Sequence, residues 1–472
     1  MRWTACAEPG TNVMMRSAAG RRDGSESMPM PFRITAGRGA LAFCAAAFHL
    51  FVALLLASLP AAAASTPDAS STPVEPGPAV VIGGGLSEAN APVWERIVAL
   101  AGGKGARIAV MPTASDDPEG SAANTVATLH RYGAEAFSIP VAPELKGTDA
   151  LAAARDPRWV EQVNGANGVF FTGGAQARIV DTLAPGGQSS PLLDAIRALQ
   201  RRGGMIAGTS AGAAIMSRTM IRDAEDVFAV LKGRMREGQE LGTGLGFATE
   251  SFIVDQHFLA RGRIGRLLPV MVERGFTVGL GVDENTAAIV NGESVEAIGA
   301  SGVLLIELHQ ADRTPGRKPF ALRNARLSLL GDGDRVDLRT RTVTPSANKR
   351  AGQLVDPTAA NFKPEYEGVP FYLDVLGPHT VREAMVRLLD SAASEARGLA
   401  FDPRTPADDP LADLGFEFRF YKAPDTRGWY SDVDDSEPYT IVGMRLDVTP
   451  VRVTRPLYRA WSASPPPVPS GP

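Results

Sequence analysis

Cysteine is almost absent from this 472-residue chain, which contains only Cys6 and Cys44. Both fall in an N-terminal segment that we expect to be removed, so the mature chain is predicted to have no thiol. This excludes disulfide bonds, a cysteine nucleophile and a thiolate metal site. The fold must then be stabilised by its core, and a composition that is 44 % hydrophobic can supply one.

A large excess of charge of either sign is also lacking. The formal net charge is −4 and the isoelectric point is about 5.9, so the chain shows no basic footprint for nucleic acid. No internal repeat is present either. The length fits one large domain or two ordinary ones.

One long apolar run lies near the N-terminus, at residues 40–59, behind Arg33 and Arg38. A basic lead, an apolar core and a small-residue site at 62–64 predict a signal peptide within a leader of residues 1–64, and hence a secreted or periplasmic protein. The alternative is a retained anchor, because the run is just long enough to span a bilayer. Only in that case would the protein contact a membrane.

Apolar strands and helical segments alternate behind a Pro/Ser-rich linker at residues 65–78. The expected strands are "AVVIGGG", "ARIAVMPTAS", "EAFSIPVA", "GVFFTGG" and "GMIAGTS", and the expected helices are "ANAPVWERIVALAG", "GSAANTVATLHRYGA", a stretch around 151–163 and "SPLLDAIRALQRRG". Continuous apolar strands separated by helices indicate an α/β fold with a mostly parallel sheet flanked by helices.

The pattern becomes rich in strands beyond residue 276, which we interpret as the far edge of the same domain, spanning residues 79–343. A C-terminal extension of mixed structure is expected at 344–461, with its aromatic residues packed against that domain. An extended, disordered tail is expected at 462–472. The acidic "DVDD" that begins at Asp432 is interpreted as a solvated loop rather than a calcium site.

Ser210 is the candidate nucleophile. It lies in G-T-S-A-G, between an apolar strand and a small-residue helix, the pattern of a tight turn that exposes a serine above a sheet. Gly208 and Gly212 are expected where neighbouring segments crowd such a turn, and the amide of Ala211 is a natural oxyanion donor. The alternative is a chance G-x-S-x-G in a chain rich in Gly and Ala.

His257 is the candidate base, because a serine hydroxyl needs one to take its proton. The other histidines are less suitable: one in the leader, one on a helix face, one beside a polar turn and one next to a proline, namely His49, His130, His309 and His379. His257 instead follows an apolar strand, at the carboxyl end where open sheets place their sites. A structural role for a strand-end histidine is the alternative.

The base needs a carboxylate, and "GLGVDENTA" supplies Asp283 and Glu284 at another strand end. The chain order of serine, histidine and acid differs from that of the α/β-hydrolases, which run serine, acid, histidine. It is the order expected of a class I glutamine-amidotransferase-like fold with serine in place of cysteine.

The segment "DQHFLARGRIGR" surrounds His257 with further polar side chains. Arg261, Arg263 and Arg266 bring three guanidinium groups, each of which can bind a carboxylate in a planar fork. Asp255 can either hold one arginine or meet a cationic group of a substrate. The alternative for the arginines is a solvated helix face with salt bridges.

Four motifs, "FFTGG-Q", "AGTSAGAAIM", "IVDQHFLARGRIGRLL" and "GLGVDENTAAIV", together resemble the cyanophycinases, of a serine peptidase family that also contains dipeptidase E. The resemblance covers roughly residues 79–342. It implies Ser210 as nucleophile, His257 as base, Glu284 as orienting acid, and Gly173 or Gly174 with Ala211 as the oxyanion hole. It also implies a substrate pocket lined by Gln176, Asp255, Gln256, Arg261, Arg263 and Arg266.

The same resemblance implies hydrolysis of cyanophycin, a poly-aspartate with arginine on each β-carboxyl, to β-aspartyl-arginine dipeptides, without metal or other cofactor and as a homodimer. Ala175 departs from the usual acidic residue before the glutamine, which puts the side-chain preference in doubt. An aspartyl dipeptidase or isoaspartyl-peptide hydrolase of the same family, and a non-catalytic binder on the same scaffold, are the alternatives.

Overall fold

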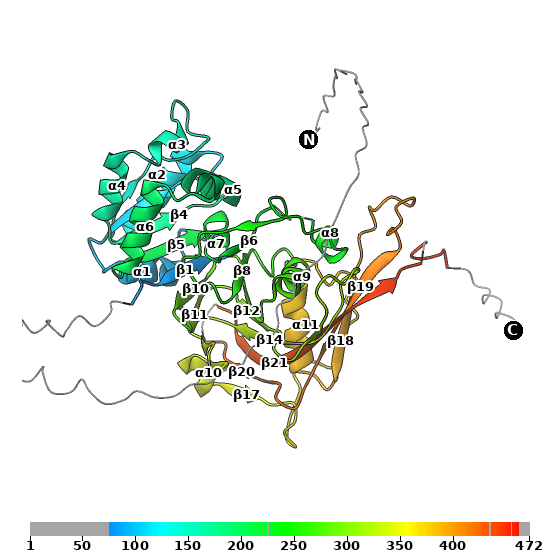
Figure 1. Cartoon of the computed structure of the whole chain (residues 1–472). Coiled ribbons are helices and arrows are strands. Elements are labelled where there is room, and N and C mark those ends of the chain that lie inside the picture. Colours follow the sequence, from blue (N-terminus) through cyan, green and yellow to red (C-terminus); the bar gives the residue numbers. More distant parts are fainter. Residues whose placement is uncertain (1–74, 224–225, 434–435, 455, 462–472) are drawn as a thin grey trace, which may run out of the picture. The chain divides into compact units, whose positions relative to one another are not determined.

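Two large sheets organise the chain in a computed structural model that describes residues 75–223, 226–433, 436–454 and 456–461 (Figure 1). The predicted leader, most of the linker and the predicted tail lie outside the described residues. Among the described residues, no helix is long and apolar enough to cross a membrane.

The first sheet has nine strands in the order β16-β15-β11-β10-β1-β5-β4-β2-β3. Its parallel part consists of β1 (Ala79–Ile82), β2 (Arg107–Met111), β3 (Glu135–Ser138), β4 (Gly168–Phe171) and β5 (Met205–Thr209). Antiparallel strands extend it, namely β10 (Thr286–Asn291), β11 (Ser294–Gly299), β15 (Arg335–Asp337) and β16 (Thr342–Thr344). The predicted strands and the α/β class are confirmed.

Helices cover both faces of the parallel strands. On one face α1 (Ala91–Leu100) and α2 (Pro118–Arg131) pack against the side chains of Val80 and Ile82. The opposite face, which includes Val81, is covered by α4 (Pro157–Asn164), α5 (Gln176–Leu183) and α6 (Pro191–Arg201). Successive strand residues thus enter different cores, which is why these strands read as continuous apolar runs.

The helix expected around 151–163 is interrupted, and α5 was not expected. The first is divided into α3 (Ala150–Ala153) and α4 because Pro157 disfavours a helical conformation of the residue before it. That residue, Asp156, instead caps α4 by accepting a hydrogen bond from the amide of Arg158.

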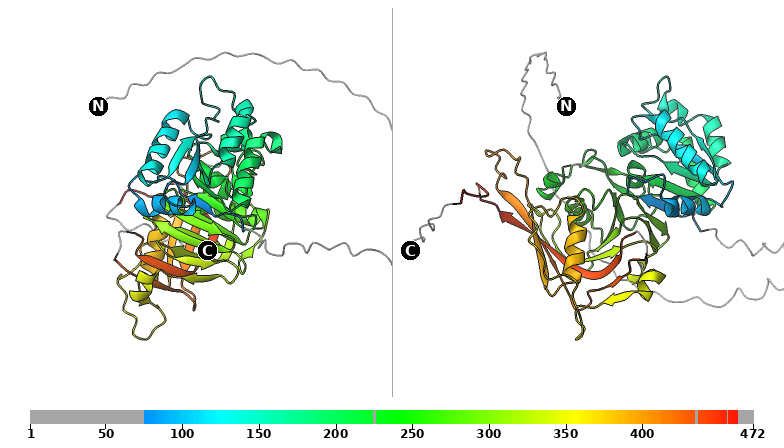
Figure 2. Two further views of the ribbon diagram at one scale, coloured as in Figure 1. Left: turned by 90° about the vertical axis from the view of Figure 1, so that its left-hand side faces the viewer. Right: turned by 180° about the vertical axis from the view of Figure 1, so that it is seen from behind.

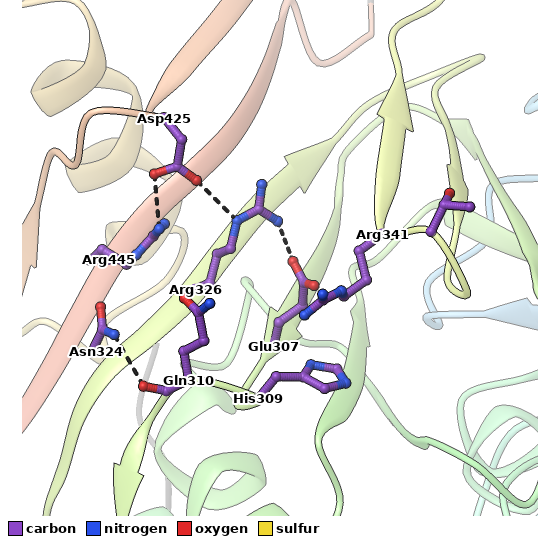
Figure 3. Close-up of a pocket in the computed structure, with 9 residues that line it drawn as sticks. Glu307, His309, Gln310, Asn324, Arg326, Arg341, Asp425 and Arg445 are labelled. Carbon is purple, nitrogen blue, oxygen red and sulfur yellow. Dashed lines mark hydrogen bonds and ion pairs between the residues drawn. The ribbon is translucent and has the colours of Figure 1, made fainter.

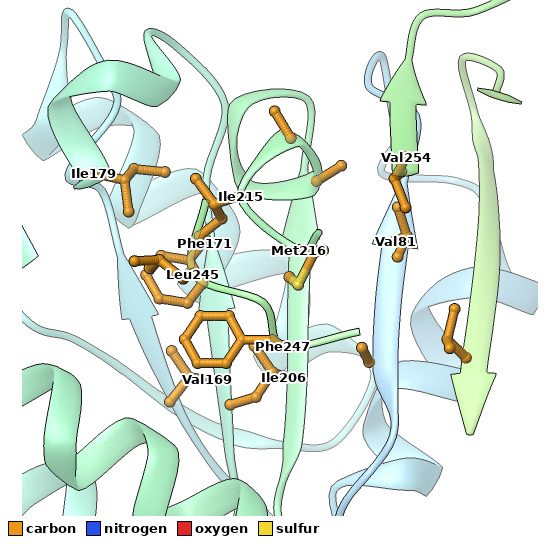
Figure 4. Packing of buried hydrophobic residues seen from close by; sticks show 14 of the residues in the cluster. Val81, Val169, Phe171, Ile179, Ile206, Ile215, Met216, Leu245, Phe247 and Val254 are labelled. Carbon is orange, nitrogen blue, oxygen red and sulfur yellow. The ribbon is translucent and has the colours of Figure 1, made fainter. Parts of the chain in front are cut away.

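Figure 4 shows part of the core cluster that contains side chains of β4, of β5 and of the segment after Ser210. Phe171 of β4 stacks on Phe247 with ring centroids 5.9 Å apart. Ile215 and Met216, which follow the nucleophile turn, are fully buried in the same cluster. This packing holds the base of the turn in place.

The second sheet runs β17-β20-β21-β14-β12-β9-β8, with β13, β18 and β19 attached. Its strands are β8 (Ile253–Gln256), β9 (Val278–Val282), β12 (Val303–Glu307), β13 (Asp312–Arg313), β14 (Leu322–Leu330), β17 (Gln353–Val355), β18 (Glu395–Ala400), β19 (Leu414–Tyr421), β20 (Arg427–Tyr430) and β21 (Tyr439–Arg452). Only β8 and β9 are parallel among its pairs. This sheet was not predicted.

The strand-rich region beyond residue 276 therefore alternates between the sheets. β9, β12 and β14 enter the second sheet, whereas β10, β11, β15 and β16 extend the first. The prediction of a single far edge is correct only for the latter four.

The remaining elements are α7 (Ala211–Ala214), α8 (Val227–Leu231), α9 (Ile264–Arg274), α10 (Ala347–Ala351), α11 (Thr380–Leu389), the 3₁₀ turn Pro185–Gly187, β6 (Thr219–Ile221) and β7 (Leu241–Thr243).

The segment beyond residue 343 is integrated into the second sheet, because β21 pairs directly with β14. Figure 2 shows α11 lying against this sheet, in contact with β18, β19 and β21. The fully buried Asp334 accepts hydrogen bonds from Lys349 at 3.1 Å and Thr440 at 2.6 Å. The boundary expected at 343 thus does not divide the described chain into separate sheets.

The three phenylalanines of β19 lie where they were expected. Phe416, Phe418 and Phe420 are fully buried in a cluster shared with Leu304 and Leu327 of the preceding region. Burial of large aromatic side chains is a major source of stability, so the two regions stabilise one another.

Candidate active site

Ser210 occupies a strained turn at the carboxyl end of β5. Its φ of 53° and ψ of −107° are rare for a residue with a side chain. Its amide donates to the carbonyl of Ile82 at 3.0 Å. A Cβ at Gly208 would lie 2.3 Å from the carbonyl oxygen of Gly212, and one at Gly212 would lie 2.5 Å from that of Phe171. The expected crowding is confirmed.

His257 faces Ser210 from the carboxyl end of β8, with Nε2 2.7 Å from Oγ. The histidine also has a positive φ, 48°, and its amide donates to the carbonyl of Gly83 at 2.7 Å. Gly84 lies against the imidazole, since a Cβ there would be 2.1 Å from Cε1. The glycines after β1 therefore allow the ring to approach the serine.

Glu284, rather than Asp283, reaches the histidine. Its Oε1 lies 2.6 Å from Nδ1 of His257. Asp283 is fully buried and accepts hydrogen bonds from the amides of Leu259 and Ala260 and from a serine hydroxyl. The two acids are adjacent in the chain, but their side chains have different partners. Asp283 supports the loop after β8, whereas Glu284 faces the imidazole.

The turn after Glu284 is held by the loop after β1. Asn285 has a φ of 54°, and its amide donates to the carbonyl of Gly84 at 2.8 Å. The side chain of Asn90 donates to both the backbone and the side-chain oxygen of Asn285 at 2.9 Å. These bonds orient the acid, as a partner of the base requires.

Burial lowers the pKa of His257 below its usual 6.5. The charges of Arg261 and Arg263 also lower this pKa, whereas the hydrogen bond with Glu284 raises it. The ring is therefore neutral near pH 7. Because a carboxylate only accepts hydrogen bonds, Nδ1 must donate to Glu284, which leaves the lone pair of Nε2 facing the serine hydroxyl. This arrangement can take a proton from Ser210 and make it nucleophilic.

A cavity of about 520 Å³ opens beside Ser210 and His257. The lining residues come from the loop after β1, from α1 and α2 and from the strand ends: Gly85, Leu86, Glu88, Trp94, Asn124, Thr125, Thr128, Phe170, Gly173, Gly174, Thr209, Ser210, His257 and Arg261. Gly173 lies against the serine, since a Cβ there would be 3.4 Å from that of Ser210. The oxyanion roles of Gly174 and Ala211 stay predictions.

Of the predicted pocket residues, only Arg261 lines this cavity. Its side chain is 53 % exposed, and its Nε lies 3.7 Å from Oε1 of Glu284. Gln176 is turned toward the loop before α8, where its amide donates to the carbonyls of Ile221 and Arg222. The structure therefore does not place Gln176 in the lining of this cavity, contrary to the expectation, and a role of Gln176 in substrate binding stays a prediction.

The other four predicted pocket residues form a buried network. Asp255 accepts two hydrogen bonds from Arg266, at 2.8 and 2.6 Å, and both side chains are at most 3 % exposed. Arg266 also donates to the side chain of Gln256, and Arg263 donates to its carbonyl. Because β8 is buried on both faces, these groups support the segment that carries His257 instead of lining the cavity.

Sequence reasoning missed the contribution of α1, α2 and the loop before them. Glu88 is the one carboxylate among the residues that line this cavity, and it pairs with Arg131 at 3.1 Å in an exposed contact. Trp94 stacks on Phe170 in the wall of the cavity. The signal that could have found Glu88 is its place in the loop that follows the carboxyl end of β1, one of the parallel strands.

The site combines a serine on a strand-to-helix turn, a histidine and an acid on an α/β scaffold, which defines a hydrolase that acts through serine. A family model described as "Peptidase family S51" matches residues 79–298. The cyanophycinase of Geminocystis herdmanii is 32 % identical over 270 residues, covering 55 % of this chain and 93 % of that protein. The cyanophycinase of Trichormus variabilis is 30 % identical over 292 residues, covering 60 % and 91 %.

The chain belongs to peptidase family S51 and is a cyanophycinase-like serine peptidase. Among solved structures, a peptidase from an acI-B1 actinobacterium is 22 % identical, with a TM-score of 0.40 over 52 % of this chain and 97 % of the other.

Proposed function

We propose that this protein hydrolyses the poly-aspartate backbone of cyanophycin to β-aspartyl-arginine dipeptides, with Ser210 as nucleophile, His257 as general base and acid, and Glu284 as the orienting carboxylate. The hydrogen-bonded chain from Ser210 Oγ through His257 to Glu284 carries this proposal. Ser210 attacks the scissile carbonyl, its proton passes to Nε2, and Nε2 then gives it to the leaving amine. Water hydrolyses the acyl-enzyme by the same route.

Groups of opposite charge lie beside the cavity, which supports a substrate that itself carries both a positive and a negative group. Arg261 offers a guanidinium fork to a backbone-end carboxylate, and Glu88 offers a carboxylate to a guanidinium. The exposed pair of Glu88 with Arg131 is worth about 0–1 kcal/mol, so a substrate cation can replace Arg131 at low cost. The names of the similar proteins support the same substrate.

Mass spectrometry of the products tests the proposal. The full-length protein, with or without its leader, is incubated with purified cyanophycin and, separately, with aspartyl and isoaspartyl dipeptides. Release of β-aspartyl-arginine from the polymer supports the proposal. Cleavage of dipeptides alone would identify a dipeptidase, and no cleavage of either would support a non-catalytic binder.

Export and a homodimer are part of the same proposal. The signal in residues 1–64 supports export. N-terminal sequencing of protein recovered from the culture medium or periplasm tests cleavage near residue 64, and light scattering tests the dimer. An intact leader on membrane-bound protein would contradict export with cleavage of the leader. A monomer at micromolar concentration would contradict the homodimer.

A further inference from the structure

A second polar pocket lies away from Ser210, between the β15–β16 turn of the first sheet and the surface of β12, β14 and β21 in the second (Figure 3). Its volume is about 260 Å³. The residues that line it are all polar: Glu307, His309, Gln310, Asn324, Arg326, Thr340, Arg341, Asp425 and Arg445. Pockets for drug-sized ligands span roughly 300–1,000 Å³, so this one fits a molecule of about amino-acid size.

The lining carries more positive than negative charge. Arg326 is bound on one side to Glu307 and on the other to Asp425, at 3.4 Å. Arg445 donates to the same Asp425 at 2.8 Å. The lining thus has three guanidinium groups and only two carboxylates. Arg326 and Arg445 bind these carboxylates, whereas Arg341 makes no hydrogen bond or ion pair with another described residue.

Arg341 combines a side chain that extends toward the pocket with an uncommon backbone conformation. Figure 3 shows its side chain extending from the β15–β16 turn toward Glu307 and His309. Its φ is 57°, and Asn324 opposite has a φ of 59° beside a register shift in β14. Positive φ in residues with side chains is costly and gathers at functional sites.

The places where residues other than glycine have positive φ also favour a functional site at this pocket. In the described ranges, six residues other than glycine have positive φ, and three of them form the candidate active site: Ser210, His257 and Asn285. Two of the other three, Asn324 and Arg341, line this pocket. Bulges and residues with strained φ are enriched at functional sites, so their presence beside this polar cavity favours a binding site.

More positive than negative groups act on His309. Burial lowers the pKa of this histidine, the charge of Arg341 lowers it further, and Arg313 acts in the same direction, whereas Glu307 opposes them. A bound anion would balance this excess. A single carboxylate neutralises one surplus guanidinium, whereas a phosphate brings more negative charge than the lining leaves unbalanced.

We propose that this pocket binds the free carboxylate group of an amino-acid-sized ligand, with Arg341 as the main contact and His309 beside it. The site is separate from the cavity at Ser210, since the two sets of lining residues share no member. The proposal does not depend on which peptide the enzyme cleaves.

The pKa of His309 provides the test, because a carboxylate bound beside the ring favours the imidazolium and raises that pKa. Histidine-labelled full-length protein is titrated by NMR with arginine, with agmatine, which is arginine without its carboxylate, with glutarate and with β-aspartyl-arginine. His309→Gln assigns the signal. Arginine should raise the pKa of His309 and agmatine should not.

The other ligands identify the source of the carboxylate. A shift with glutarate shows that any small dicarboxylate is accepted, and a shift with arginine or β-aspartyl-arginine but not glutarate shows that amino-acid chemistry is required; both outcomes support the proposal. No shift with any of the carboxylates at about 10 mM, a concentration that detects even millimolar affinity, would overturn it, as would equal shifts with arginine and agmatine.

Two arginines of the same turn provide matched variants. Arg341→Gln should weaken binding at least about tenfold, as expected when a charge-assisted fork is lost. Arg339→Gln, exposed on the same turn but absent from the lining, should leave affinity within about twofold. Equal affinity of the two variants would contradict the assignment of Arg341. Ser210→Ala should bind unchanged, which separates this site from failure of the proposed hydrolysis.

Discussion

His257 forms its 2.7 Å hydrogen bond with Ser210 across the boundary between two sheets. Ser210 follows β5 of the first sheet, whereas His257 follows β8 of the second. The amide of His257 donates to the carbonyl of Gly83, directly after β1, so the loop after β1 helps to fix the distance between Ser210 Oγ and His257 Nε2.

Substitution of the three hydrogen-bonded residues should remove activity to different extents. Ser210→Ala and His257→Ala should each lower kcat/KM on cyanophycin by roughly 10⁴–10⁶, and Glu284→Gln should leave weak activity, because the acid only orients and stabilises the base. Steady-state kinetics measure the change in kcat/KM, and circular dichroism checks that each variant is folded. Near-normal turnover by His257→Ala would exclude it as the base.

The acid limb of the pH–rate profile should lie below pH 6.5. The folded pKa of His257 is lowered by burial and by Arg261, so the ring stays neutral until the pH falls through that lowered value, and kcat/KM declines only there. Arg261→Gln removes one of the lowering charges and should move the limb to higher pH. Arg158→Gln, an exposed arginine that does not act on His257, should leave it in place; an unmoved limb in Arg261→Gln would refute the electrostatic assignment.

Gly84→Ala should lower kcat by roughly 10²-fold while the protein stays folded. The added methyl would lie 2.1 Å from the imidazole of His257, and displacement of a reacting group by about 1 Å costs that much. Gly292→Ala is the control, since Gly292 also has a positive φ but no atom within 4 Å of the new methyl. Equal kinetics in the two variants would show that Gly84 does not position the ring.

Asp255→Ala should destabilise the fold by about 3–5 kcal/mol, because it leaves Arg266 as a buried charge without its carboxylate. Urea unfolding measures the loss. Arg218→Ala, which breaks the exposed pair with Glu250, should cost at most about 1 kcal/mol. If Asp255→Ala instead raised KM with unchanged stability, the residue would bind substrate after all.

Ala175→Asp should stabilise the protein by about 1 kcal/mol. Ala175 is the N-cap of α5 and makes no capping hydrogen bond, which Asp would supply. Ala175→Asn should stabilise similarly, and Ala175→Val should not. If Asp but not Asn also lowers KM for cyanophycin, the negative charge contacts the substrate's guanidinium; equal KM values would limit the residue to capping.

Local patterns in the sequence were sufficient for much of this protein. Neighbouring residues in the chain were enough to predict the alternating apolar strands and helices between residues 79 and 209 and the nucleophile turn at Ser210. They were also enough to select His257 among the five histidines. The reason is that strand and turn preferences act over a few residues. The family's motifs likewise lie within short segments.

Tertiary structure alone decided which of the neighbouring polar residues face the cavity. Asp283 and Glu284 are adjacent and both follow β9, yet only Glu284 reaches the imidazole. Arg261 lines the cavity while Arg266, five residues later, is buried against Asp255. The second sheet, assembled from β8 to β21, determines these orientations, because burial depends on contacts between segments far apart in the chain, to which local preferences are insensitive.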